Sequence, residues 1–173
     1  MRKTTYANRG MKLEKLIDES NKAYLFGTGL QRNYIASVHK VPTPTKILNK
    51  KKGIVTGYNT RGEFVDYIGT MIGGFSIAFD AKETKQKSLP LANIHESQYK
   101  FLSTWYSLGA ITFLVVHFSE LDEYYRIDFK ELRDAWNNAL EGGRKSIPAS
   151  SLKNRIIVKD GILHYMEGLW DEY

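Results

Sequence analysis

The stretch Ile77-Ala78-Phe79-Asp80-Ala81-Lys82-Glu83-Thr84-Lys85 decides the fold of this 173-residue chain. Its first half is apolar, as in a buried strand, and strand side chains alternate between the two faces of a sheet. This alternation places the apolar odd-numbered side chains up to Ala81 on one face and Asp80 and Lys82 on the other. A strand that packs into the core therefore carries an acid and a base side by side.

A second carboxylate precedes this strand on its expected hairpin partner. Residues 64–68 and 75–82 predict two strands, and Gly73-Gly74 predicts the turn that joins them. Within that hairpin, Asp66 can reach Asp80. The sequence therefore predicts two carboxylates that meet across neighbouring strands.

The paired carboxylates and the lysine have the spacing of a metal-dependent nuclease. Two carboxylates and the backbone carbonyl of Ala81 form an oxygen-rich site suited to Mg²⁺, which takes few protein ligands and keeps several waters. Bound ions would activate water and neutralise charge on a phosphate, and Lys82 would contact that phosphate or position the water. The structural alternative is a solvated strand face with a surface salt bridge that includes Glu83, because a D…D-x-K spacing often arises by chance.

Positive charge is concentrated in the first third of the chain. Residues 1–61 hold 13 Lys and Arg against three acids, a net charge of +10, whereas the remaining 112 residues hold 12 against 16, a net charge of −4. A basic block of this kind attracts phosphate polyanions and binds them less tightly as salt rises. Charge alone would equally suit an anionic lipid surface or another acidic partner.

Composition excludes several classes of protein. The chain has no cysteine, so it has no disulfide, no thiolate zinc site and no cysteine nucleophile. No segment approaches the roughly 18 uninterrupted apolar residues of a membrane span, and the basic N-terminus leads into no apolar signal segment. We expect a cytoplasmic protein without membrane association.

We expect one α/β domain over residues 1–173, with a mixed central sheet flanked by helices. Asn93 and Glu96 resemble a capping box that starts the second helix. Residues 41–62 are basic and interrupted by prolines, which predicts a mobile excursion from the body, and residues 151–173 are expected to form a C-terminal extension. Helices are predicted at 8–25, 93–108 and 131–140, strands at 34–38, 64–68, 75–82, 110–118 and 124–129, a sheet edge that ends at 88–90, and a hairpin on Asp160-Gly161.

Five segments, in order, resemble RecU-type Holliday junction resolvases. They are Asn8-Arg9-Gly10-Met11-Lys12-Leu13-Glu14, His39-Lys40-Val41-Pro42-Thr43-Pro44, Ala81-Lys82-Glu83-Thr84-Lys85, Leu89-Pro90-Leu91-Ala92-Asn93-Ile94-His95-Glu96-Ser97-Gln98 and Gly142-Gly143-Arg144-Lys145-Ser146-Ile147-Pro148. The resemblance covers about residues 8–150. It implies a restriction-endonuclease-like nuclease fold, a homodimer, and Mg²⁺ or Mn²⁺ for paired nicks in four-way DNA junctions during recombination and repair.

The resemblance also implies roles for five side chains. Asp66 and Asp80 match the metal ligands of the family, together with the carbonyl of Ala81, and Lys82 matches its catalytic lysine. Glu14, on the first predicted helix, matches an acid that supports the metal through water. Gln98 matches a helix residue that faces the same centre.

The chain departs from the family pattern at three places. Asp80 stands where the family usually has Glu, Val65 stands where it has Thr before the first Asp, and residues 41–62 match a shortened form of the stalk that enters the junction centre. Two alternatives follow for the function. One is a related nuclease with different or broader selectivity for DNA structure, and the other is an inactive-site DNA-binding or scaffold protein.

Further residues are expected to contact DNA or to pack inside the protein. We expect His117, in an apolar strand, to be a core histidine with satisfied hydrogen bonds, and Trp105, Trp136 and Tyr124-Tyr125 to lie in the core or in a dimer interface. Recombination proteins are possible partners. The predicted DNA-binding residues are Arg9, Lys40, Lys46, Lys50, Lys51, Lys52, Arg61, Lys85, Arg144 and Lys145.

Overall fold

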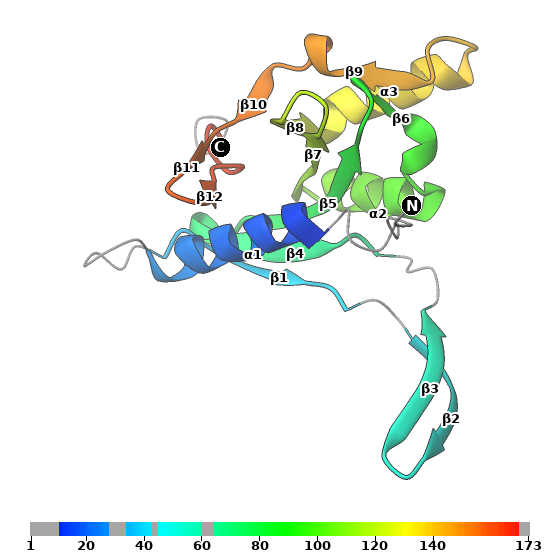
Figure 1. The fold of residues 1–173 in the computed structure, drawn as a ribbon. Coiled ribbons are helices and arrows are strands. Elements are labelled where there is room, and N and C mark those ends of the chain that lie inside the picture. Colours follow the sequence, from blue (N-terminus) through cyan, green and yellow to red (C-terminus); the bar gives the residue numbers. More distant parts are fainter. Residues whose placement is uncertain (1–10, 28–33, 43–44, 60–63, 170–173) are drawn as a thin grey trace.

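The computed structural model describes residues 11–27, 34–42, 45–59 and 64–169, and its centre is a six-stranded mixed sheet (Figure 1). The strand order is β1-β4-β5-β7-β8-β10. Strands β5 and β7 pair in parallel, and the other neighbours pair antiparallel. The strands are β1 (Ala36–Lys40), β4 (Tyr67–Met71), β5 (Ser76–Thr84), β7 (Ile111–Phe118), β8 (Glu123–Asp128) and β10 (Asn154–Ile156). The predicted α/β class with a mixed sheet is confirmed.

Helices cover both faces of this sheet, as Figure 1 shows. Helix α1 (Met11–Phe26) packs Leu13 and Ile17 into one core cluster, which the C-terminal segment completes. Helices α2 (Glu96–Ser107) and α3 (Phe129–Leu140) pack against a second cluster on the other face. Every residue of the central strand β7 is buried, because both of its faces are covered.

Three small two-stranded sheets and three short 3₁₀ helices complete the described chain. The Asp160-Gly161 turn joins β11 to β12 with positive φ at both residues, so the predicted C-terminal hairpin is confirmed. The strand pairs are β2 (Thr45–Lys51) with β3 (Ile54–Asn59), β6 (Ser88–Pro90) with β9 (Ser146–Pro148), and β11 (Val158–Lys159) with β12 (Ile162–Leu163); the 3₁₀ helices are η2 (Ile72–Gly74), η3 (Leu91–Asn93) and η4 (Ala149–Ser151).

The predicted basic excursion at 41–62 contains the β2–β3 hairpin. These two strands pair with each other, and Figure 1 shows the hairpin standing apart from the central sheet. Its tip is Lys52-Gly53, where both residues have positive φ. Its use as a stalk stays a prediction.

The second helix begins later than the sequence predicted. Asn93 belongs to η3, and the capping residue of α2 is His95, whose ring accepts from the backbone N–H of Ser97. The capping box pairs His95 with Gln98, so the predicted box of Asn93 with Glu96 is wrong. Leu108, the last residue of the predicted helix, lies past the last helical turn and is 81% exposed.

Several predicted strand ends are also corrected. The first strand runs over residues 36–40, and the strand expected at 64–68 begins at Tyr67 and continues to Met71. Residues 88–90 do not end the central sheet; they pair with β9 in a separate sheet. Such errors fall at element ends, where tertiary pairing decides where a strand stops. Residues 8–10 of the predicted first helix lie outside the described residues.

The β4–β5 hairpin forms as predicted and sets the geometry described below. Gly73 and Gly74 both have positive φ at the turn, a conformation that glycine adopts without steric cost. The pairing brings Tyr67 opposite Phe79. Gly69 lies so close to β1 that a Cβ atom there would stand 2.3 Å from the backbone oxygen of Ser37.

None of the helices in the described ranges has the length and apolar character needed to cross a membrane.

Candidate active site

The β4–β5 hairpin brings Asp66 and Asp80 into contact through backbone and side-chain groups. The backbone N–H of Asp66 donates to Asp80 Oδ1 at 3.2 Å. The backbone N–H of Ala81 donates to Asp66 Oδ2 at 3.0 Å. Because each carboxylate accepts from the backbone of the segment that carries the other, the two side chains are held at one place. The predicted meeting of Asp66 and Asp80 is confirmed.

Lys82 and Gln98 close this group of side chains. Lys82 Nζ lies 2.6 Å from Asp80 Oδ2 and donates to Gln98 Oε1 at 2.9 Å. Gln98 Nε2 donates to Asp80 Oδ1 at 2.8 Å. The same Gln98 Oε1 accepts from the backbone N–H of His95 at 3.2 Å, so the cap of α2 also orients this amide.

Burial dominates the electrostatics of Asp80. Its side chain is fully buried, and this burial raises its pKa; Lys82 opposes the rise, Asp66 adds to it, and the result is a pKa of about 7. Its Oδ2 atom is buried and has no hydrogen-bond partner, although the ammonium of Lys82 lies beside it. A buried carboxylate oxygen with spare lone pairs is a ligand position for a cation.

The donor set fits a hard divalent metal. Asp66 and Asp80 supply carboxylate oxygens, and the carbonyl of Ala81 is the predicted third donor. Within the described ranges, no three His, Cys, Asp or Glu side chains converge tightly enough to hold a metal by themselves. Two carboxylates that are completed by water suit a hard divalent cation, which prefers oxygen ligands.

Glu14 lies on α1, on the opposite face of the sheet from α2. Its Oε2 atom accepts from Lys40 Nζ at 2.6 Å. Burial opposes the positive charge of Lys40, but the hydrogen bond and attraction of Glu14, together with Asp18 and Asp66, raise its pKa. Lys40 thus pairs with an acid of α1 and is close enough to Asp66 for electrostatic attraction, an arrangement that sequence spacing gave no signal for.

Most of the predicted DNA-binding residues are exposed, but the structure gathers only some of them. Four lysines lie together on the β2–β3 hairpin, at positions 46, 50, 51 and 52, and Lys85, Arg144 and Lys145 are exposed elsewhere. Lys40 is exposed yet paired with Glu14. Arg9 and Arg61 lie outside the described residues.

The expectation for His117 is wrong in one respect. The ring is buried, as predicted, and stacks on Tyr124 with centroids 4.3 Å apart. Neither ring nitrogen has a hydrogen-bond partner, and the nearest carboxylate oxygens are on Glu83 at 3.8 Å and Asp122 at 3.5 Å.

Four other aromatic side chains were predicted to lie in the core or in a dimer interface. Tyr124 and Tyr125 are buried, and Trp105 and Trp136 are partly buried at the margin of the second core cluster.

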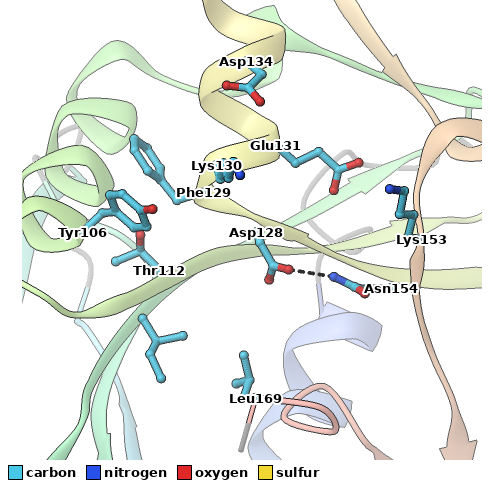
Figure 2. A pocket seen from close by; sticks show the side chains of 11 residues that line it. Tyr106, Thr112, Asp128, Phe129, Lys130, Glu131, Asp134, Lys153, Asn154 and Leu169 are labelled. Carbon is cyan, nitrogen blue, oxygen red and sulfur yellow. Dashed lines mark hydrogen bonds between the residues drawn. The ribbon is translucent and has the colours of Figure 1, made fainter. Parts of the chain in front are cut away.

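A pocket of about 600 Å³ lies elsewhere, between the start of β7, the start of α3 and β10 (Figure 2). Figure 2 shows Asp128, Glu131 and Asp134 on its wall, with Asp128 Oδ2 accepting from Asn154 Nδ2 at 2.7 Å. Three acids against Lys130 and Lys153 do not favour a polyanion. None of the paired carboxylates, Lys82 or Gln98 lines this pocket.

Comparison with known proteins identifies the family. The family described as Recombination protein U matches residues 8–170. The Holliday junction resolvase RecU of Oceanobacillus iheyensis is 38% identical over 157 residues, covering 87% of this chain and 76% of the relative. The proteins of the same name from Oenococcus oeni and Bacillus mycoides are 37% and 36% identical, covering 91% and 88% of this chain and 77% and 76% of each relative. The resemblance found in the sequence is confirmed, and this chain belongs to the Recombination protein U family.

Proposed function

We propose that this protein is a Mg²⁺-dependent endonuclease that resolves four-way DNA junctions by paired nicks. The observation that carries the proposal is the group formed by Asp66, Asp80, Lys82 and Gln98, in which two carboxylates and an ammonium meet at a buried position. The family and the names of the relatives support the same activity.

Asp66 and Asp80, with the carbonyl of Ala81 and water, would hold the metal. When bound, Mg²⁺ supplies an activated water and neutralises charge on the phosphate. Lys82 is fixed by Asp80 and Gln98, so its ammonium is pre-positioned to contact an oxygen of the scissile phosphate or to orient the attacking water. Gln98 bonds both Lys82 and Asp80, and its own amide oxygen accepts from the backbone N–H of His95 at the cap of α2. Glu14 would support the metal through water.

The β2–β3 hairpin supplies the proposed contact with the branch of the junction. Lysines 46, 50, 51 and 52 place four positive charges on it, and Ile47, Leu48 and Ile54 are exposed beside them. Lysine side chains bind the phosphates of the DNA backbone, and apolar side chains contact bases that lose their stacking partners at a branch. The other basic residues remain predicted DNA contacts: Arg9, Arg61, Lys85, Arg144 and Lys145. Lys40 would release Glu14 and bind a DNA phosphate in its place.

A homodimer is part of the proposal, because paired nicks across a two-fold junction need two active sites related by two-fold symmetry. An apolar surface suited to a second copy lies along α2 and the β4–β5 turn. Phe64 contacts Phe101 edge-on at 5.6 Å, and Phe101 stacks on Trp105 at 5.0 Å. Leu108, just past the end of α2, and Ile72, in the β4–β5 turn, are 81% and 65% exposed. Large exposed apolar side chains in such number favour an interface.

A cytoplasmic location and contact with other recombination proteins stay predictions that rest on this proposed substrate.

Asp80→Asn and Lys82→Ala are expected to lower the cleavage rate of a synthetic four-way junction about 100-fold or more, since the first removes a charged metal ligand and the second removes the ammonium that contacts the phosphate or orients the water. Junction binding in a mobility-shift assay should stay close to wild type. Lys130→Ala, an exposed lysine on α3, is the matched control. Full cleavage by both variants in Mg²⁺ contradicts the assignment, and equal cutting of a linear duplex indicates a nuclease of broader selectivity.

Mg²⁺ binding to the free protein, measured by calorimetry, is expected to be lost in Asp66→Asn and kept in Asp134→Asn, an exposed carboxylate of α3. Because burial raises the pKa of Asp80 to about 7, a proton occupies this ligand at pH 6 and is absent at pH 8. The affinity should therefore be about tenfold weaker at pH 6 than at pH 8. Equal affinity at both values, or no binding by wild type, contradicts the proposed metal site.

The change of Lys50, Lys51 and Lys52 to Ser should weaken junction binding and reduce the slope of log affinity against log salt by about three, since each phosphate contact releases about one counterion. The matched control changes Lys87, Lys130 and Lys159, three exposed lysines outside the hairpin, to Ser. If both triple variants lose the same affinity, the hairpin makes no specific contact.

Leu108→Glu together with Ile72→Glu is expected to convert a dimer to a monomer in sedimentation velocity and to separate the paired nicks in time, because two charges would be buried in the interface. Ile157→Glu, at a residue that is 59% exposed on another surface, should remain dimeric. A wild-type protein that sediments as a monomer at assay concentration would refute the dimer.

A further inference from the structure

Tyr67 lies directly behind the two catalytic carboxylates. It follows Asp66 in the chain, and its ring stacks on Phe79, the residue before Asp80, with centroids 4.9 Å apart and planes within 10°. The two rings face each other across the hairpin because Tyr67 and Phe79 are register partners. Tyr67 is fully buried. The stacked rings of Tyr67 and Phe79 therefore join the two residues that are the chain neighbours of the two acids.

The hydroxyl of Tyr67 crosses from the sheet to α1. It donates to Asp18 Oδ1 at 3.1 Å and lies 3.5 Å from the backbone oxygen of Glu14. Glu14 and Asp18 are four residues apart, so they share one face of the helix. Burial raises the pKa of Tyr67, and Asp18 and Glu14 raise it further, so the hydroxyl stays a donor at any pH at which the protein works.

The two halves of α1 are attached to different parts of the protein. The C-terminal half of α1 is hydrogen-bonded to the last described segment of the chain. Ser20 Oγ accepts from the backbone N–H of Leu163 at 2.8 Å, and the Tyr165 hydroxyl donates to Asn21 Oδ1 at 2.6 Å. The N-terminal half, which carries Glu14, meets the sheet through the buried side chains of Leu13 and Ile17, through Tyr67, and through the ion pair of Glu14 with Lys40. Lys40 is exposed, whereas Tyr67 is buried and its bond to Asp18 is part-buried.

We propose that Tyr67, through Asp18, is a positioning residue that fixes Glu14 relative to Asp66 and Asp80 and thereby sets the Mg²⁺ affinity of the site. This inference rests on the proposed metal centre and its support by Glu14. The hydrogen bond of Tyr67 to Asp18 joins β4 to α1, the helix that carries Glu14. Without it, Glu14 is held by the packing of Leu13 and Ile17 beside it and by its ion pair with Lys40, and that pair is open to competition from DNA phosphate and salt.

Tyr67→Phe tests the hydrogen bond to Asp18, because the variant keeps the ring that stacks on Phe79 and removes only the hydroxyl that donates. We expect Mg²⁺ binding by calorimetry, without DNA, to weaken about tenfold, the lower end of the range for residues that orient metal-supporting groups. The Mg²⁺ concentration that gives half-maximal junction cleavage should rise by the same factor. At saturating Mg²⁺ the cleavage rate should fall less than about twofold, because the groups that meet the phosphate are unchanged.

Tyr165→Phe is the matched control. Tyr165 is also fully buried, its hydroxyl also bonds a side chain of α1, and its ring also packs on Phe79, at 5.0 Å. The variant removes the same chemical group from the half of α1 that lacks Glu14. We expect a loss of thermal stability similar to that of Tyr67→Phe and no change in Mg²⁺ affinity.

Two further variants separate positioning from general damage. Asp18→Ala should weaken Mg²⁺ binding as Tyr67→Phe does, and Asp18→Asn, which keeps an acceptor oxygen, should lose less. In a Glu14→Gln background, Tyr67→Phe should cause no additional weakening, because the side chain that it positions has lost its charge.

The outcomes distinguish this inference from the proposed function. If wild type binds Mg²⁺ and cuts, but Tyr67→Phe has wild-type Mg²⁺ affinity, the positioning role is wrong and the function stands. The same conclusion follows if Tyr165→Phe weakens Mg²⁺ binding equally, or if the effects of Glu14→Gln and Tyr67→Phe simply add. If wild type neither binds Mg²⁺ nor cuts, the proposed function fails and this inference fails with it.

Discussion

The antiparallel register of β4 against β5 is the constraint on which the rest of the site depends. It places Tyr67 opposite Phe79 and so lets Asp66 exchange hydrogen bonds with Asp80 and Ala81. A slip by one residue would turn the acid and the lysine of β5 to the other face of the sheet. The glycine turn and the stacked rings of residues 67, 79 and 113 oppose that slip, since every ring of the stack is buried.

The same register forces a carboxylate into the interior, which costs free energy. Burial raises the pKa of Asp80 toward neutrality even with Lys82 beside it. Buried ion pairs seldom stabilise a fold more than apolar side chains of similar size would. A buried acid with one oxygen lacking a hydrogen bond is therefore better explained by chemistry than by stability. Gln98 limits the cost, because it bonds both the acid and the ammonium.

Both layers of helix contact the β4–β5 hairpin, each through a different kind of contact. Helix α2 holds Gln98 in a capping box, so the local geometry of a helix start orients the amide that bonds Asp80 and Lys82. Helix α1 is joined to the hairpin through a long-range contact, the bond of Tyr67 to Asp18 across 49 residues of sequence. A helix start is encoded locally, whereas the position of a whole helix depends on what it packs against.

The sequence by itself determined that Asp80 and Lys82 share a strand face and that Asp66 can reach Asp80, because alternation and the glycine turn are local properties. The place of Gln98 beside them came from the family resemblance. It misplaced the cap of α2, since Asn93 was taken up by a 3₁₀ helix, and it expected hydrogen bonds for His117 that the fold does not provide. Only the tertiary structure decided that Lys40 pairs with Glu14 and that Tyr67 bonds Asp18. Those partners lie far apart in sequence, and periodicity within an element carries no record of what packs against it.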